Sequence, residues 1–206
     1  MTPLNIVLNI LSIGIPFSVS LLLASLGEMF NQRAGIFNLG CEGIMSMGAF
    51  LGFICAYYFQ NTALAPYVNL LGILAAGVAG ALLGLLFALV TVTFHAPQGI
   101  AGIGLQMLGI GTAGTLFRHF VGGVTGVPGL PSYPIPLLSK IPFIGPVFFN
   151  MNMLAYLAFL LVPLSHYILF KTPWGLKVRA VGTSPRSADT MAINVQRTRY
   201  QALAVG

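Results

Sequence analysis

The groups of this chain that could carry out acid–base, metal or phosphate chemistry are few and scattered. The three acids, Glu28, Glu42 and Asp189, lie far apart in sequence, and the three histidines lack metal-ligand spacing. The glycines lie along apolar stretches, and no GxxxxGK(S/T) loop, which would cradle phosphates, is present. We therefore expect no catalytic site and no cofactor in this chain, and no ATPase activity of its own.

Glu42 is the one acid inside a predicted membrane segment. Intramembrane acids mark functional sites, but a carboxylate in the first turn of a helix is also stabilised by the helix dipole, and the second interpretation is favoured. Gln98 and Gln106 are eight residues apart on similar faces of one predicted helix. They could line a polar path with Glu42 and Ser46, or equally hold the bundle together by hydrogen bonds between helices.

These polar residues belong to a strongly apolar chain. Of its 206 residues, 57% are hydrophobic and 6% are charged, whereas a soluble domain carries about 25% charged residues. The apolar runs are too long for barrel strands, so the sequence predicts an all-α, polytopic transmembrane helix bundle. The net charge of +6 reflects basic loops and not a nucleic-acid surface.

Five spanning segments are predicted, at residues 4–26, 36–59, 69–94, 99–117 and 151–170. A polar break at residues 28–35 follows the first, and Asn38 is the predicted N-cap of the second. Residues 118–150 contain six prolines and form a long connection. Residues 200–206 begin a sixth apolar run, but a span needs about 20 residues, so we expect a truncated chain within one transmembrane domain over residues 1–206.

Small residues at four-residue spacing predict close contacts between helices. One such stripe lies in the second segment and consists of Gly48, Gly52 and Ala56. Another lies in the third segment and consists of Ala76, Gly80, Gly84 and Ala88.

The segment at residues 171–199 carries most of the charge. It holds six of the nine Lys and Arg residues and one acid, for a net charge of +5. Short basic loops stay in the cytoplasm. Counting back along the chain then places residues 118–150 outside, and Arg33 and residues 95–98 inside.

The same segment contains signals for a short helix. Ser184 is a good N-cap and Pro185 follows at the first helical position. An apolar stripe then recurs at helical spacing, flanked by Arg186 and Asp189; its members are Ala188, Met191, Ala192 and Val195. Because so short a helix is marginal alone, we expect it to dock, either on its own membrane domain and the headgroups or on a cytoplasmic partner.

Three stretches resemble one family of membrane proteins. Residues 32–50, QRAGIFNLGCEGIMSMGAF, are similar to a motif of the permease subunits of ABC importers for branched-chain amino acids, simple sugars and nucleosides, and are closest to nucleoside permeases. Residues 95–105, HAPQGIAGIGL, and residues 174–195, WGLKVRAVGTSPRSADTMAINV, resemble its short turn and its coupling segment. The chain departs from the family pattern at Pro97, at Ser184, and at Ala192, where the family has Gly.

The resemblance implies a type II ABC importer-like fold in the bacterial plasma (inner) membrane. Two permease subunits, identical or homologous, would enclose a path for a nucleoside or simple sugar. Separate cytoplasmic ATP-binding subunits would receive the coupling segment, including residues 184–195, and an extracytoplasmic binding protein would deliver the substrate. The alternatives are an ion-coupled carrier or channel without an ATPase, and a structural membrane subunit.

Overall fold

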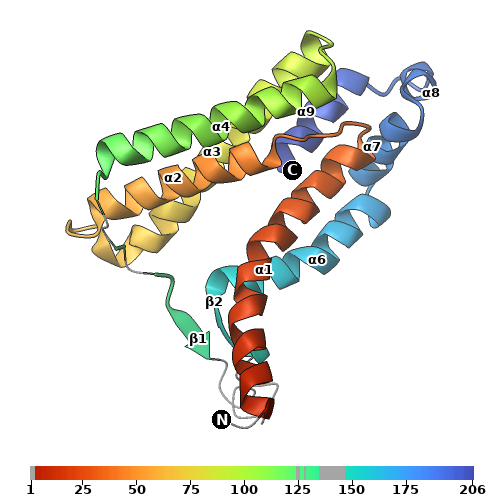
Figure 1. Ribbon diagram of the computed structural model, residues 1–206. Coiled ribbons are helices and arrows are strands. Elements are labelled where there is room, and N and C mark those ends of the chain that lie inside the picture. The colour runs from red at the N-terminus through yellow and green to blue at the C-terminus, as the bar shows by residue number, and fades with distance from the viewer. Residues whose placement is uncertain (1–2, 124–125, 128, 135–146) are drawn as a thin grey trace. The chain divides into compact units, whose positions relative to one another are not determined.

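The computed structural model describes residues 3–123, 126–127, 129–134 and 147–206. Five of its helices are long and apolar enough to cross a membrane, which confirms the all-α, polytopic bundle (Figure 1). The elements are α1 Pro3–Arg33, α2 Cys41–Phe59, η1 Ala65–Tyr67, α3 Val68–Ala88, η2 Leu89–Thr93, α4 Gln98–Phe120, β1 Ser132–Pro134, β2 Asn150–Asn152, α6 Met153–Lys171, α7 Pro173–Thr183, α8 Pro185–Thr190 and α9 Val195–Val205.

Contacts group the chain into two compact units, Met1–Leu26 with Leu130–Tyr167, and Gly27–Gly129 with Ile168–Gly206. In the first, β1 and β2 pair antiparallel with Ser132 opposite Asn152. The Tyr156 hydroxyl of α6 accepts from the Met151 N–H and donates to the Tyr133 carbonyl, each at 3.2 Å. A small apolar core of Val19, Met151, Ala155 and Ala158 completes this unit. Much of the predicted outer connection, including residues 135–146, lies outside the described residues.

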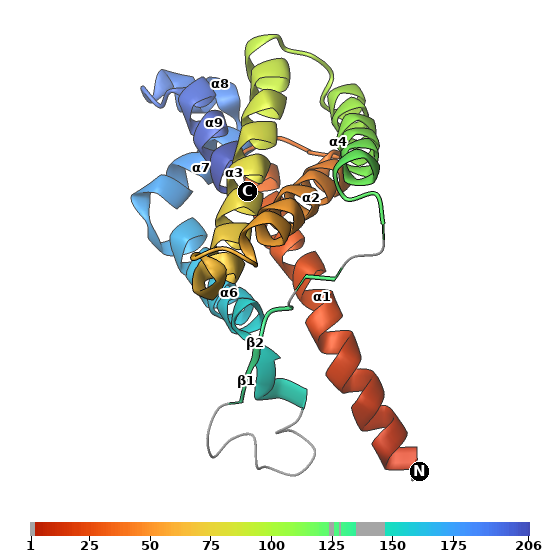
Figure 2. The ribbon, with the colours of Figure 1, turned by 90° about the vertical axis from the view of Figure 1, so that its left-hand side faces the viewer.

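In the second unit, α2 packs against both α3 and α4 (Figures 1 and 2). A Cβ placed on Gly52 would lie 3.1 Å from the Gly72 carbonyl oxygen of α3, so the small-residue stripe of α2 does face a close helix neighbour. On α3, members of the predicted small-residue stripe face different neighbours. A Cβ on Gly84 would lie 3.0 Å from the Leu203 carbonyl of α9, whereas one on Gly80 would meet only the Ile44 side chain at 3.7 Å.

The predicted polar break after the first segment is wrong, because α1 continues to Arg33. The Glu28 carboxylate accepts from the side-chain amides of Asn31 and Gln32 within that helix. It also accepts from the Asn38 N–H at 3.1 Å. Polar side chains three and four residues apart therefore satisfy one another and let the helix persist.

The predicted N-cap of α2 is also wrong. The helix begins at Cys41 after Gly40, and the Asn38 side chain accepts from the Gly40 N–H at 2.8 Å. Asn38 thus stabilises a turn two residues before the helix. Glu42 does lie in the first turn of α2, as predicted.

Two features of the helices were not predicted. The third segment ends in the π-helix η2, after which His95 takes a left-handed conformation with φ 54°. Residues 173–183 form the helix α7, with Thr172 as its N-cap. Trp174 of α7 packs its ring against Phe30 and donates from Nε1 to the Gln201 amide oxygen at 3.1 Å.

Candidate functional site

Glu42 and Gln106 form a hydrogen bond between two membrane helices. Gln106 Nε2 of α4 donates to Glu42 Oε2 of α2 at 2.5 Å. The two helices touch here through backbone, since a Cβ on Gly43 would lie 2.6 Å from the Gln106 Cα, and one on Gly109 would lie 2.6 Å from the Gly43 Cα. Two glycines thus bring a carboxylate and an amide together across the helix interface.

Ser46 lies one turn beyond Glu42 and lines a cavity between α2 and α4. The cavity has a volume of about 320 Å³ and is otherwise apolar, lined by Ala49, Phe50, Phe53, Ala113 and Phe117. The three residues Glu42, Ser46 and Gln106 therefore follow one another along the same helix pair. A carboxylate, an amide and a hydroxyl beside aromatic rings could bind a small polar ring compound by hydrogen bonds and stacking.

Gln98 does not belong to this group. Its Oε1 accepts from the Phe37 N–H at 2.9 Å, and its Nε2 donates to the Gly35 carbonyl at 3.5 Å. Eight residues in a helix correspond to an offset of about 80° and a rise of about 12 Å, so Gln98 reaches the loop after α1 while Gln106 reaches α2. The structure assigns Gln98 to tying residues 35–37 to the start of α4.

The coupling segment begins as the sequence predicted. The Ser184 hydroxyl accepts from the Ser187 N–H at 3.4 Å, and Pro185 is the first residue of α8. Arg186 and Asp189 are exposed on this helix.

The prediction that the four residues of the apolar stripe share one helix is wrong. Helix α8 ends at Thr190, and Ala192 takes a left-handed conformation with φ 58°. The Ile193 N–H donates to the Ala188 carbonyl and the Ala192 N–H to the Asp189 carbonyl, at 3.1 and 3.0 Å. These two bonds form a Schellman motif, which ends a helix. Val195 belongs instead to the start of α9, whose N-cap is Asn194.

Two members of that stripe, Ala188 and Met191, face different surroundings. Ala188 is 3% exposed, buried within the chain itself, whereas Met191 is 77% exposed. Helix α8 packs against α7. The segment therefore rests on its own chain through Ala188 and leaves the Met191 side chain free to meet another surface.

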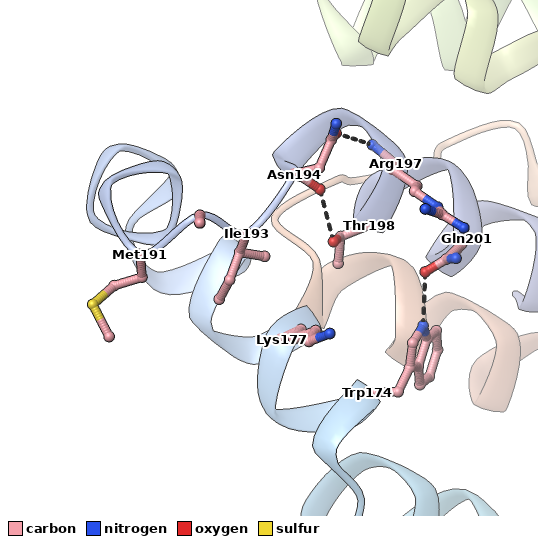
Figure 3. A pocket seen from close by; sticks show the side chains of 9 residues that line it. Trp174, Lys177, Met191, Ile193, Asn194, Arg197, Thr198 and Gln201 are labelled. Atoms are coloured by element: carbon pink, nitrogen blue, oxygen red, sulfur yellow. Dashed lines mark hydrogen bonds between the residues drawn. The ribbon is translucent and has the colours of Figure 1, made fainter.

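A cavity of about 590 Å³ lies beside this segment, between α7 and α9. Figure 3 shows Trp174 and Lys177 reaching it from α7 and Arg197, Thr198 and Gln201 from α9, while Met191 extends away from the other labelled side chains. The Asn194 side chain accepts from the Arg197 N–H at 2.9 Å and so holds the start of α9. The N-cap signal of Asn194 could have revealed α9 from the sequence; the cavity itself carries no local signal.

Comparisons with known proteins give a consistent result. Residues 10–206 match the family described as "Branched-chain amino acid transport system / permease component". The guanosine ABC transporter permease NupQ of Bacillus subtilis is 38% identical, and the match covers 94% of this chain and 63% of that protein. The nucleoside ABC transporter permease NupC of Lactococcus lactis is 35% identical, with 89% and 59% covered.

A third relative has a different named substrate. The putative glucose ABC transporter permease TsgC13 of Haloferax volcanii is 33% identical, and the match covers 96% of this chain and 59% of that protein. The chain thus spans about three fifths of the length of these relatives. No solved structure matches this chain significantly.

Proposed function

Because this chain belongs to the branched-chain amino acid transport system permease family, we propose that it is the membrane-spanning subunit of an ATP-driven importer. Family membership and five apolar helices place it in the plasma (inner) membrane as a multi-pass protein, as the sequence predicted. In this proposal it forms part of the path for a small polar solute, together with a second permease subunit. ATP hydrolysis takes place on separate cytoplasmic subunits.

The observation that carries the coupling role is the construction of α8. Its backbone is held by the Ser184 cap and by buried Ala188, and it presents Met191 beside the cavity lined by Lys177 and Arg197. An exposed, adaptable methionine on a fixed turn fits an apolar groove of a partner, and nearby cations favour a partner surface with acidic groups. In our proposal this segment transmits movement of the ATP-binding subunit to the membrane helices.

For the substrate, a nucleoside is favoured over a sugar. Two relatives are named as guanosine or nucleoside permeases and a third as a putative glucose permease. The cavity next to Ser46 is lined by three phenylalanine rings, those of Phe50, Phe53 and Phe117. A flat purine stacks on such rings, while Glu42 and Gln106 could bind its polar edge or ribose hydroxyls.

The test is uptake of radiolabelled guanosine by the assembled transporter, comprising this permease, its ATP-binding subunit and its substrate-binding protein. We expect uptake that stops when the ATP-binding subunit carries an inactivating substitution in its phosphate-binding loop. Excess unlabelled nucleoside should suppress uptake more than excess glucose. Uptake that continues with the inactive ATPase and follows an ion gradient would contradict the proposal and support an ion-coupled carrier.

The substitution Gln106→Leu tests the proposed path independently of the coupling segment. It removes the amide that donates to Glu42, so we expect the KM for guanosine to rise or uptake to fall, while the ATP-binding subunit still co-purifies. Thr115→Val is a matched control, since Thr115 lies on the same helix and its hydroxyl donates only to the Gly111 carbonyl of that helix. Wild-type KM and uptake in Gln106→Leu would exclude the Glu42–Gln106 pair from the path.

A further inference from the structure

Two arginines from different helices lie over one aromatic ring near the end of α6. Arg33 is the last residue of α1 and Arg179 lies in α7, and their guanidinium carbons are 5.5 and 5.0 Å from the centre of the same ring, that of Phe170. Both cations thus lie within cation–π distance of one aromatic side chain. Such a contact supplies no oxygen acceptor for the guanidinium N–H groups.

Arg199 of α9 reaches the same place through a close backbone crossing. A Cβ on Gly35 would lie 3.2 Å from the Gly182 Cα and 3.7 Å from Nη2 of Arg199. Gly35 is two residues beyond Arg33, and Gly182 is three residues beyond Arg179. The crossing therefore brings the end of α1, the end of α7 and the Arg199 side chain of α9 together. We name the three cations of these helices the arginine cluster: Arg33, Arg179 and Arg199.

A buried core beneath this cluster holds it in place. The core consists of Phe30, Ala34, Leu169, Val178 and Ala202. Its members Ala34, Leu169 and Val178 are the immediate sequence neighbours of Arg33, Phe170 and Arg179. Gly35 has φ +76°, which a larger residue would adopt only with strain. The cluster is therefore built by packing and does not depend on mobile side chains alone.

The charge of the cluster is not balanced by the acids of this chain. Glu28 is occupied by Asn31, Gln32 and Asn38, Glu42 by Gln106, and Asp189 is exposed on α8. The Nε atoms of Arg179 and Arg199 are buried and have no hydrogen-bond partner among the residues that the structure describes. Three adjacent cations repel one another and two of their donors lack acceptors, so an anion with several oxygen atoms would stabilise the arrangement.

We propose that the arginine cluster binds the phosphate group of an anionic phospholipid at the membrane boundary. Arg33 and Phe170 lie at the ends of the apolar spans Ile6–Arg33 and Met153–Lys171, where headgroups are found. The guanidinium fork matches phosphate oxygens, and basic sites between membrane helices on the cytoplasmic side bind anionic headgroups. Arg33 is exposed and the other two arginines are half-buried, so a headgroup can enter from outside. The proposal does not rest on the transport function.

The test compares phosphatidylglycerol with phosphatidylcholine as lipids retained by the intact detergent-purified protein, measured by native mass spectrometry and by lipid titration. The wild type should prefer phosphatidylglycerol. One arginine at a headgroup contributes about fivefold in affinity, so the triple variant R33Q/R179Q/R199Q should lose about 100-fold. The matched control is K177Q/R186Q/R197Q, which removes the same charge from the same region outside the cluster and should retain the preference.

Two further variants keep the test decisive if the triple glutamine variant does not fold. R199Q alone should lose about fivefold, and R33K/R179K/R199K, which keeps the charge but not the fork, should bind phosphatidylglycerol more weakly than wild type. Equal binding of both lipids by the wild type, or an equal loss in the matched control, would overturn the proposal. Displacement of the lipid by excess inorganic phosphate would overturn the lipid assignment and identify a site for free phosphate.

Discussion

The backbone N–H of Met191 donates to the Ala188 carbonyl at 3.1 Å, yet the two side chains face opposite surroundings, one exposed and one buried within the chain. One turn of chain thus docks on its own protein through Ala188 and leaves the Met191 side chain exposed, where our proposal places the partner. Because Ala188 is buried, Ala188→Glu would disturb this docking as well as any partner contact.

Met191→Glu is therefore the sharper test of coupling. Burying a methionine in a partner groove contributes roughly 1.5–3 kcal/mol, and a buried unpaired carboxylate would cost more. We expect at least a tenfold weaker association with the ATP-binding subunit and a similar loss of uptake, measured by co-purification and transport. Met191→Leu keeps an apolar side chain and should be close to wild type. If Met191→Glu couples normally, Met191 does not contact the ATPase.

Ala192→Gly should stabilise the protein. Ala192 has φ 58° at the end of α8, a conformation that costs a non-glycine residue roughly 1–2 kcal/mol. Allowing for the greater freedom of glycine in the unfolded chain, we expect a gain of about 1 kcal/mol, or about 2–4 °C in the apparent midpoint of thermal unfolding. Ala192→Val should lower that midpoint. A lower midpoint for Ala192→Gly would contradict the left-handed conformation.

Gln98→Leu should affect stability and not substrate affinity. It leaves the Phe37 N–H without its side-chain acceptor, and because this hydrogen bond is exposed we expect a loss of about 0.5–1.5 kcal/mol, the net contribution of a typical hydrogen bond. We expect a lower unfolding midpoint with an unchanged KM for guanosine, the opposite of the pattern for Gln106→Leu. A raised KM at an unchanged midpoint would indicate that Gln98 lines the translocation path.

Gly109→Ala should damage the contact between α2 and α4. The new Cβ would lie 2.6 Å from the Gly43 Cα, and backbone cannot move aside as a side chain can. Overpacking of this kind costs roughly 1–3 kcal/mol, which thermal unfolding would detect. Gly111→Ala is the control on the same helix, since its Cβ would have nothing within 4 Å. Equal stability of the two variants would show that the helices are not in backbone contact.

The orientation in the membrane can be tested by cysteine labelling with an impermeant reagent. Ser187 and Ser132 are both exposed, and the charge distribution predicts that they lie on opposite sides. Ser187→Cys should be labelled only from the cytoplasm and Ser132→Cys only from outside, with the unsubstituted chain as the control for Cys41 and Cys55. The reverse pattern would overturn the orientation.

Tertiary contacts support one part of that topology. The Phe37 N–H donates to Gln98, and the Thr93 and Tyr200 hydroxyl oxygens lie 2.5 Å apart. These contacts bring the loop after α1 close to the start of α4, and the end of η2 close to α9. That these segments share one side of the membrane stays a prediction. Which side is cytoplasmic stays a prediction from the basic residues.

The features that could be predicted from the sequence are those whose causes are local or repetitive. Apolar runs of about 20 residues form membrane helices because the backbone must satisfy its own hydrogen bonds in lipid. Ser184 and Pro185 begin α8 because capping involves only residues within one turn. The resemblance to the permease family also marked Ala192 as a departure from Gly, at the position where a left-handed conformation ends the helix.

Which residues meet depends on the packing of the helices. Nothing local distinguishes Gln98, which holds a loop, from Gln106, which pairs with Glu42, since the difference lies in the helices that pack against each. The same is true of Ala188 and Met191, whose burial depends on α7. It is true also of Arg33, Arg179 and Arg199, whose helices are brought together by a glycine crossing and a shared core. Side-chain surroundings arise from contacts between segments distant in sequence, and a hydrophobic period does not encode those contacts.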